Sequence, residues 1–148
     1  MLSDKYFFGT YNNSIDAKSR IIIPSKFREK LGEGCVVTIG IENCLCVYSQ
    51  EDFGRLAVRM SEIPDSAIRA RSFVRALFGN ATVCEFDKQG RIVVPQHLKE
   101  QTNIEKELVT IGVMDRVEIW AKEVWASDDT TALPDREELA EALREFGF

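Results

Sequence analysis

The sequence has few of the side chains on which catalytic and metal sites depend. Its 148 residues include one histidine, His97, and four cysteines that form no Cys-x-x-Cys pair. It contains neither a Gly-x-Ser-x-Gly motif nor a phosphate-binding glycine loop. We therefore expect no enzyme, no catalytic residue, no bound metal, no cofactor and no small-molecule substrate, and we place His97 at the surface.

Long apolar runs are also missing. No stretch approaches the roughly 20 apolar residues of a membrane span, and Asp4 and Lys5 interrupt the first apolar cluster, so no signal peptide is expected. Hydrophobic residues still make up 45% of the chain and charged residues 29%, which is typical of globular proteins. We expect a cytoplasmic protein with a buried core and no membrane partner.

The cysteines indicate a reduced interior. Cys44 and Cys46 lie two residues apart in an apolar run, so both side chains would share one face of a strand. We expect these two, together with Cys35 and Cys84, to be buried core thiols. A metal-binding or disulfide role is the less favoured alternative.

Acidic residues outnumber basic ones, and the excess lies in the C-terminal tail. The net charge is −5, and the segment from Asp128 onward carries seven acidic residues against two arginines. Residues 1–127 carry 17 basic and 17 acidic side chains, and residues 16–30 carry five basic side chains against two acidic ones. Because the distribution of charge matters more than its sum, the overall acidity does not exclude DNA as a partner.

The chain contains the same module twice. Residues 16–24 (DAKSRIIIP) align with residues 87–95 (DKQGRIVVP) at an offset of 71, with identical Asp, Arg, Ile and Pro. When one extra residue is allowed in the second copy, residues 36–40 (VVTIG) align with residues 108–112 (LVTIG). Such an ordered series of matches indicates an internal duplication.

Each copy predicts the same order of elements. A polar turn leads into a short β-branched strand, and a proline ends the strand because it lacks the amide donor that a central strand needs. A brief helix and two further strands follow. The expected turns are residues 16–19 and 87–90, the β-branched strands 21–23 and 92–94, the prolines Pro24 and Pro95, and the later strands 35–40, 45–48, 107–113 and 116–120.

Helices are expected between the copies and at the end of the chain. Apolar residues over 53–63 keep a helical spacing, and a second helix should run over about 66–78. Residues 127–133 indicate a linker. After Pro134 we expect a short amphipathic helix with an apolar stripe of Leu139, Leu143 and Phe146. Because so short a helix is marginal in water, it should pack on its own chain or, alternatively, cap a subunit interface.

The repeated Asp-x-x-x-Arg turn is the main candidate for a binding site. Asp16 could simply accept turn amides while Arg20 begins a strand as a solvated or ion-paired residue. The recurrence of the pair as Asp87 and Arg91 favours a second interpretation, in which two arginine-bearing turns share one face. Arginine makes bidentate contacts with guanine edges and phosphates, and nearby lysines can add phosphate contacts.

These turns resemble those of the MraZ family, which belongs to the SpoVT-AbrB class of DNA-binding proteins. The resemblance rests on Asp-x-Lys-Gly-Arg, three apolar residues and Pro, present twice, and extends over about residues 7–125. It also includes Phe-Arg-Glu-Lys-Leu at 27–31, Leu-Phe-Gly-Asn-Ala at 77–81 and Glu-Ile-Trp at 118–120. Two copies with an intervening helical pair make the signal specific.

The resemblance implies an α+β fold in which two swapped-hairpin β-barrel half-domains interleave as a pseudo-dimer within one chain. The corresponding domains are a first repeat over 7–53, a connecting helical region over 54–80, a second repeat over 81–126, and an acidic linker with a C-terminal helix over 127–148.

The resemblance also implies a sequence-specific regulator, mostly a repressor, of the division and cell-wall gene cluster. Such a protein binds direct repeats in double-stranded promoter DNA as a homo-oligomeric ring and associates with the nucleoid. The expected DNA-binding residues are Lys18, Arg20, Arg91, Lys88, Lys26 and Arg28, and the expected turn-shaping residues are Asp16, Asp87 and Gly90.

Two positions depart from the family motif. Ser19 replaces glycine in the first turn, where a left-handed conformation would cost about 1 kcal/mol, so we expect the two loops to differ in shape. Gln89 replaces lysine in the second turn and removes one positive charge. The alternative function is an antitoxin-type module that acts mainly through protein contacts; the acidic tail favours it, and the duplication weighs against it.

Overall fold

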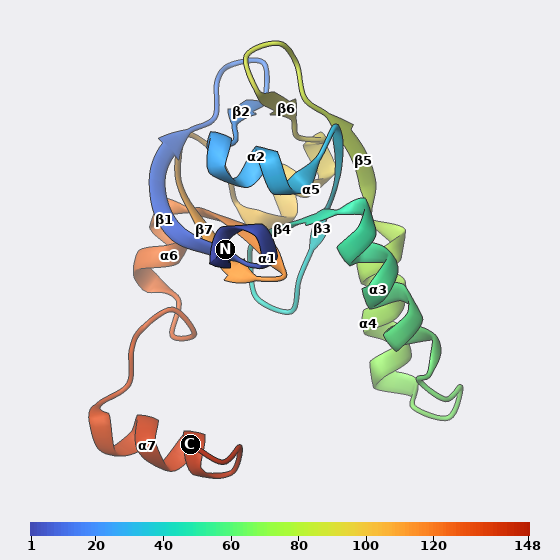
Figure 1. Ribbon diagram of the computed structural model, residues 1–148, viewed down its shortest axis with the longest axis vertical. Helices are drawn as coiled ribbons and strands as arrows, with labels where there is room; N and C mark the ends of the chain where they lie inside the picture. Colours follow the sequence, from blue (N-terminus) through green and yellow to red (C-terminus); the bar gives the residue numbers. More distant parts are fainter.

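The elements follow the predicted order in both repeats. A computed structural model describes residues 1–148 (Figure 1). α1 (Leu2–Lys5) precedes the first repeat, which comprises β1 (Phe7–Ser14), β2 (Arg20–Ile22), α2 (Ser25–Leu31), β3 (Gly34–Ile39) and β4 (Leu45–Ser49). The connecting helices are α3 (Gln50–Ser61) and α4 (Ile68–Gly79). The second repeat and tail comprise β5 (Thr82–Glu85), β6 (Arg91–Val93), α5 (Gln96–Thr102), β7 (Glu107–Met114), β8 (Arg116–Ala121), α6 (Lys122–Ser127) and α7 (Arg136–Arg144).

The two short helices begin directly after the repeated prolines, as predicted. Pro24 is the N-cap of α2 and Pro95 is the N-cap of α5, so each proline ends a strand and starts a helix. Phe27 and Leu31 lie one turn apart on α2 and are buried, and Leu98 of α5 is buried at the corresponding place. The helices therefore contribute one apolar face each to the core.

Strands from the two repeats join in one antiparallel sheet. Its order is β1-β7-β8-β4-β3-β5, so the first strand of each repeat pairs with a strand of the other repeat. β2 and β6 leave this sheet and pair with each other, with Ile21 opposite Ile92 at the centre. We call this two-stranded sheet the β2–β6 ribbon. It lies at one end of the molecule beside the two turns (Figure 1).

The expected closed β-barrel is wrong. β1 and β5 form the two edges of the six-stranded sheet and do not pair with each other. The reason lies in β2 and β6, which turn away after the polar loops and satisfy their backbone groups in the ribbon. The α+β class is confirmed, and all neighbouring strands pair antiparallel, but the sheet stays open.

Alternating side chains divide the core between the two faces of the sheet. Along β4, Leu45 and Val47 contribute to a cluster shared with α2, α5 and the ribbon. Cys46 and Tyr48 point to the opposite face, where α3 packs against β4 and α6 packs against β7 and β8. The ribbon and its turns are thus anchored by one core cluster, and the connecting helices by the other.

The C-terminal helix does not pack on its own chain. Asp135 caps α7 by accepting the Glu138 N–H at 2.9 Å, which confirms the predicted helix. Its apolar stripe stays open to solvent, with Leu143 38% and Phe146 73% exposed. In Figure 1 α7 lies apart from the sheet and from the other helices. The expectation that it docks on its own chain is therefore wrong.

Two smaller predictions are also answered. All four cysteines are free and buried, which confirms the expected core thiols. His97 is exposed on α5, as predicted. None of the helices combines the length and apolar character that crossing a membrane requires.

Candidate nucleic-acid interface

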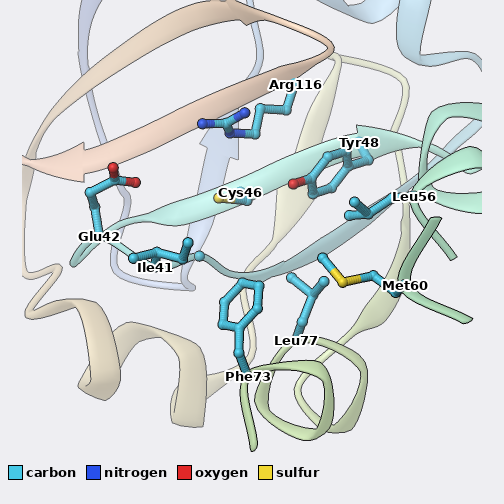
Figure 2. Close-up of a pocket in the computed structure, with 10 residues that line it drawn as sticks. Ile41, Glu42, Cys46, Tyr48, Leu56, Met60, Phe73, Leu77 and Arg116 are labelled. Carbon is cyan, nitrogen blue, oxygen red and sulfur yellow. The ribbon is translucent and has the colours of Figure 1, made fainter. Parts of the chain in front are cut away.

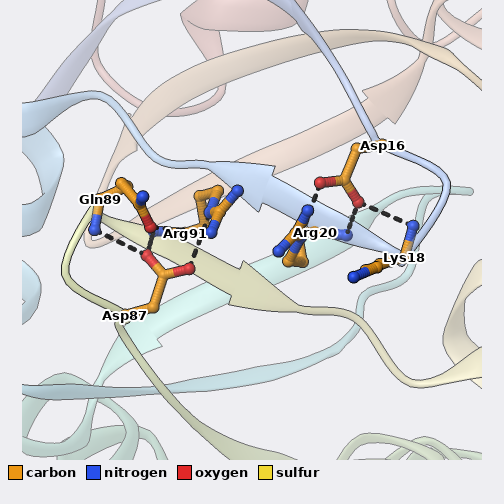
Figure 3. A network of polar contacts seen from close by, with 6 residues as sticks. All are labelled: Asp16, Lys18, Arg20, Asp87, Gln89 and Arg91. Carbon is orange, nitrogen blue, oxygen red and sulfur yellow. Dashed lines mark hydrogen bonds and ion pairs between the residues drawn. The ribbon is translucent and has the colours of Figure 1, made fainter.

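Asp16 organises the first turn through both of its carboxylate oxygens. Oδ1 accepts the backbone N–H groups of Lys18 and Arg20, each at 2.9 Å, and Oδ2 accepts the Arg20 Nε–H at 2.7 Å. The Asp16 carbonyl also accepts the Ser19 N–H at 3.0 Å. The loop conformation and the direction of the arginine are therefore set by one side chain (Figure 3).

Asp87 repeats this arrangement in the second turn. Its Oδ1 accepts the N–H groups of Gln89 and Arg91 at 2.9 Å, and its Oδ2 accepts the Arg91 Nε–H at 2.7 Å. Ser19 has φ +61° and Gly90 has φ +76°, so both turns use the left-handed region. The expectation that the loops differ in shape is wrong, because Ser19 adopts the conformation for which glycine is usually required.

The carboxyl groups of Asp16 and Asp87 have pKa values below the ordinary aspartate value. The Arg20 backbone N–H, followed by its guanidinium and the Lys18 N–H, holds the pKa of Asp16 below its usual value. The same groups of Arg91 and the Gln89 N–H lower the pKa of Asp87. At neutral pH each arginine therefore faces a permanent anion at its Nε.

The two arginines differ in how many Nη donors remain unused within the chain. The terminal Nη atoms of Arg20 donate no hydrogen bond within the chain, whereas Arg91 donates one from Nη2 to Gln89 Oε1 at 2.8 Å. Both side chains are partly open to solvent, at 28% for Arg20 and 21% for Arg91. Arg20 in the first turn thus presents both Nη groups as free donors. In the second turn, Gln89 already accepts a hydrogen bond from Nη2 of Arg91 (Figure 3).

Strand register places both arginines on one face of the ribbon. Arg20 lies opposite Val93, and Arg91 lies opposite Ile22, with Ile21 and Ile92 between them. Because successive residues of a strand point to opposite faces, Ile21 and Ile92 enter the core while Arg20 and Arg91 point outward. Between the arginines lie Ile22 and Val93, which are 55% and 58% exposed. Sequence reasoning missed these two apolar residues, although the period-2 pattern of the strands could have found them.

The four other expected DNA-binding residues fall into two groups. Lys18 and Lys88 are exposed in the turns beside the arginines. Arg28 is committed to the fold, since its Nε donates to the Ile23 carbonyl at 2.9 Å. Lys26 lies with its Nζ 3.5 Å from the centroid of the Phe8 ring. Phe8 is the second residue of β1, about 20 Å of strand from the turn that follows it, so the Lys26 ammonium lies away from that turn, although Lys26 also lines a pocket with Ile22 of β2.

A cation from the opposite repeat supports each turn. Lys99 of α5 donates from Nζ to the Ser19 Oγ at 2.8 Å. Arg28 of α2 occupies the corresponding place over Gly90, where an added Cβ would overlap the guanidinium. Backbone bonds also cross between the repeats, from the Val94 N–H to the Ser19 carbonyl at 2.8 Å. Sequence reasoning missed Lys99, because nothing local connects it with a residue 80 positions away.

A separate polar cluster lies under the connecting helices. The Sγ atoms of Cys44 and Cys46 and a carboxylate oxygen of Glu118 lie within 4.8 Å of one another. Glu118 accepts the Trp120 Nε1–H at 3.1 Å on Oε1 and the Arg116 Nη2–H at 2.9 Å on Oε2. The hydrogen bond with Cys46 and burial raise the pKa of the Cys44 thiol. A protonated thiol beside a carboxylate that is already paired is a buried structural network.

The comparisons with known proteins agree with the duplication. The family model of the MraZ protein, whose description adds "antitoxin-like", matches residues 6–76 and again residues 77–143. The chain is 46% identical over 140 residues to the "Transcriptional regulator MraZ" of Caldanaerobacter subterraneus subsp. tengcongensis, covering 95% of this chain and 98% of that relative.

Other bacterial relatives carry the same name. The "Transcriptional regulator MraZ" of a Thermoanaerobacter species is 47% identical over 140 residues, with 95% of this chain and 98% of the relative covered. That of Clostridium tetani is 44% identical over 142 residues, with 96% and 99% covered. The matches therefore run through both repeats and the tail. The chain belongs to the MraZ family of transcriptional regulators.

Proposed function

We propose that the chain regulates transcription by binding double-stranded DNA through its two arginine-bearing turns. The observation that carries this proposal is the outward pair of Arg20 and Arg91, each held at Nε by an aspartate of its own turn. A two-stranded β-ribbon fits the major groove of B-DNA, and a guanidinium with free Nη donors matches the O6 and N7 acceptors of guanine. The aspartates hold the guanidinium groups in place before DNA arrives, which reduces the entropy lost on binding.

Positive and apolar neighbours complete the proposed contact surface. Lys18 and Lys88 lie in the turns, where exposed ammonium groups bind phosphates and add affinity without reading sequence. Ile22 and Val93 lie between the arginines and offer apolar contact to thymine methyl groups. Arg28 and Lys26 serve the fold in this proposal, in contrast to the role expected from sequence.

Assembly of several chains would multiply the weak contact that the turns of one chain make with DNA. We propose a homo-oligomeric ring whose repeated turn faces engage direct repeats in promoter DNA at high effective concentration. The pairing of β1 with β7 and of β5 with β3 supports an interleaved pseudo-dimer within each chain. Repression of the division and cell-wall gene cluster, association with the nucleoid, and the division into 7–53, 54–80, 81–126 and 127–148 remain proposals that rest on the family resemblance.

A protein-binding role is the second candidate. The exposed apolar stripe of α7 and the words "antitoxin-like" in the family description favour it. The two functions make different demands, since partner binding through α7 does not need Arg20 or Arg91. A variant that loses both arginines but retains regulation would favour the second candidate.

The test is a titration of the protein onto DNA from upstream of its own gene at several salt concentrations. We expect affinity to fall steeply with salt, because Lys and Arg contacts release counterions. Arg20→Ala should weaken binding by about tenfold or more. The matched control is Arg59→Ala on α3, an exposed arginine far from the ribbon. Equal affinity of Arg20→Ala and wild type would refute the proposed site.

A further inference from the structure

The apolar stripe of α7 has no partner within the chain. The helix spans only Arg136–Arg144, and isolated helices of that length are marginal in water. Leu143, Phe146 and Phe148 are nevertheless exposed, at 38%, 73% and 85%. A helix with a formed N-cap and an uncovered apolar stripe is typical of a segment that is ordered by packing against something else.

A cavity beside the connecting helices has the matching character. It has a volume of about 190 Å³ and lies between β4, the loop after β3, and the pair α3 and α4. Figure 2 shows Leu56, Met60 and Phe73 directed toward it from the helices. Ile41 on its rim is 83% exposed. The cavity is open to solvent, mostly apolar, and of a size that suits one aromatic side chain.

The charge of α4, which forms one wall of the cavity, complements the charge of α7. α4 carries Arg69, Arg71 and Arg75 and no acidic residue, and of these Arg71 pairs with Asp65 at 3.4 Å. Residues 135–145 around α7 carry five acidic side chains against two basic ones. Opposite potentials on two surfaces favour their association and exclude like-charged partners.

We infer that α7 of one copy packs its apolar stripe into the cavity beside α3 and α4 of a second copy. Within one chain α7 lies apart from α3 and α4 (Figure 1). Because the helix and the cavity are different surfaces, every copy offers one of each. Contacts that run head to tail form a closed ring or an open chain, whereas a reciprocal exchange of α7 between two copies would stop at a dimer. The inference rests on the proposed ring and names the segment that joins its subunits.

Sedimentation of point variants tests the contact. Leu143→Glu on the helix and Met60→Glu in the cavity should each weaken self-association by about tenfold or more, because each buries a charge in an apolar contact. Leu133→Glu, in the same tail but outside the stripe, is the matched control and should assemble as wild type does. If Leu143→Glu and Met60→Glu both assemble as wild type does, the inference is overturned.

Cross-linking decides whether the contact lies between chains. In a variant with both Arg75→Cys and Glu141→Cys, a flexible bismaleimide should give a ladder of covalent multimers, whereas each single substitution should not. The four native cysteines are buried and should not react in the folded protein. Cross-linked monomer alone, or no cross-link, would overturn the inference.

DNA binding separates this inference from the proposed function. Leu143→Glu leaves both turns intact, so it should lose only the gain in affinity that a second DNA repeat provides. Arg20→Ala should do the reverse, assembling normally while binding DNA poorly. A wild-type protein that assembles but does not bind this DNA would refute the proposed function without contradicting the α7 contact.

Discussion

At the scale of single residues, one aspartate in each repeat does several tasks at once. Asp16 and Asp87 each accept two backbone N–H groups and one guanidinium N–H. The same bonds close the turn and direct the arginine outward. Loop shape and the placement of Arg20 and Arg91 are therefore coupled, and a change at either aspartate should affect both.

The turn aspartates should titrate below their usual range. Their pKa values are lowered in the folded chain, so the ion pairs stabilise the fold above the ordinary aspartate pKa. That contribution is lost only as pH falls through the lowered values. We expect ¹³C NMR of the Asp16 and Asp87 carboxyls to give midpoints below about 3.9. Midpoints at or above that value would contradict the hydrogen bonding described.

The left-handed positions in the two turns should respond differently to substitution. Gly90→Ala places a Cβ where Arg28 lies and strains a φ of +76°, so it should lower the free energy of unfolding by about 1–3 kcal/mol. Ser19→Gly relieves strain but loses the Lys99 hydrogen bond, so it should stay within about 0.5 kcal/mol of wild type. Urea denaturation of both variants measures the contrast. Equal effects would count against cross-repeat support of the turns.

At the scale of elements, the β2–β6 ribbon connects the core with the proposed DNA surface. Ile21 and Ile92 lie opposite each other and are fully buried, while their neighbours on both strands point outward. Each ribbon strand has only three residues, so packing rather than strand length must hold it in place. The ribbon should therefore depend strongly on these two side chains.

Truncating the ribbon core should be costly. Ile21→Ala and Ile92→Ala should each lower the free energy of unfolding by about 2–5 kcal/mol, because each leaves a cavity between the ribbon and α2 or α5. The two losses should not add in the double variant, since the residues are in contact. Chemical denaturation of the three variants gives the cycle. Additive losses, or losses under about 1 kcal/mol, would show that the ribbon is not held as described.

Local pattern predicted the elements well and their partners poorly. The strand after each turn and the helix after each proline were predictable, because Pro24, Pro95 and the β-branched runs act on their own neighbours. Barrel closure failed as a prediction because it depends on pairing between distant edges. The Lys99–Ser19 bond and the Cys44–Glu118 cluster were equally out of reach, since residues far apart in sequence form them.

At the scale of the whole molecule, the proposed functions lie on separate surfaces. The turns and ribbon occupy one end, α3 and α4 extend from the body, and α7 lies apart from both (Figure 1). Substitutions should therefore be able to remove the proposed DNA binding and the proposed self-association independently. The acidic excess lies in the tail, so the net charge of −5 does not oppose the proposed contact of the turns with a polyanion.

The proposed DNA binding depends most on the two outward arginines, Arg20 and Arg91. The most direct measurement compares wild type, Arg20→Ala/Arg91→Ala and the Arg59→Ala control on the same upstream DNA, after sedimentation has shown equal assembly. The double variant should lose about 100-fold or more in affinity for this DNA while the control is unchanged, because two bidentate donors are removed from one face. A double variant that binds within about twofold of wild type would contradict the proposal.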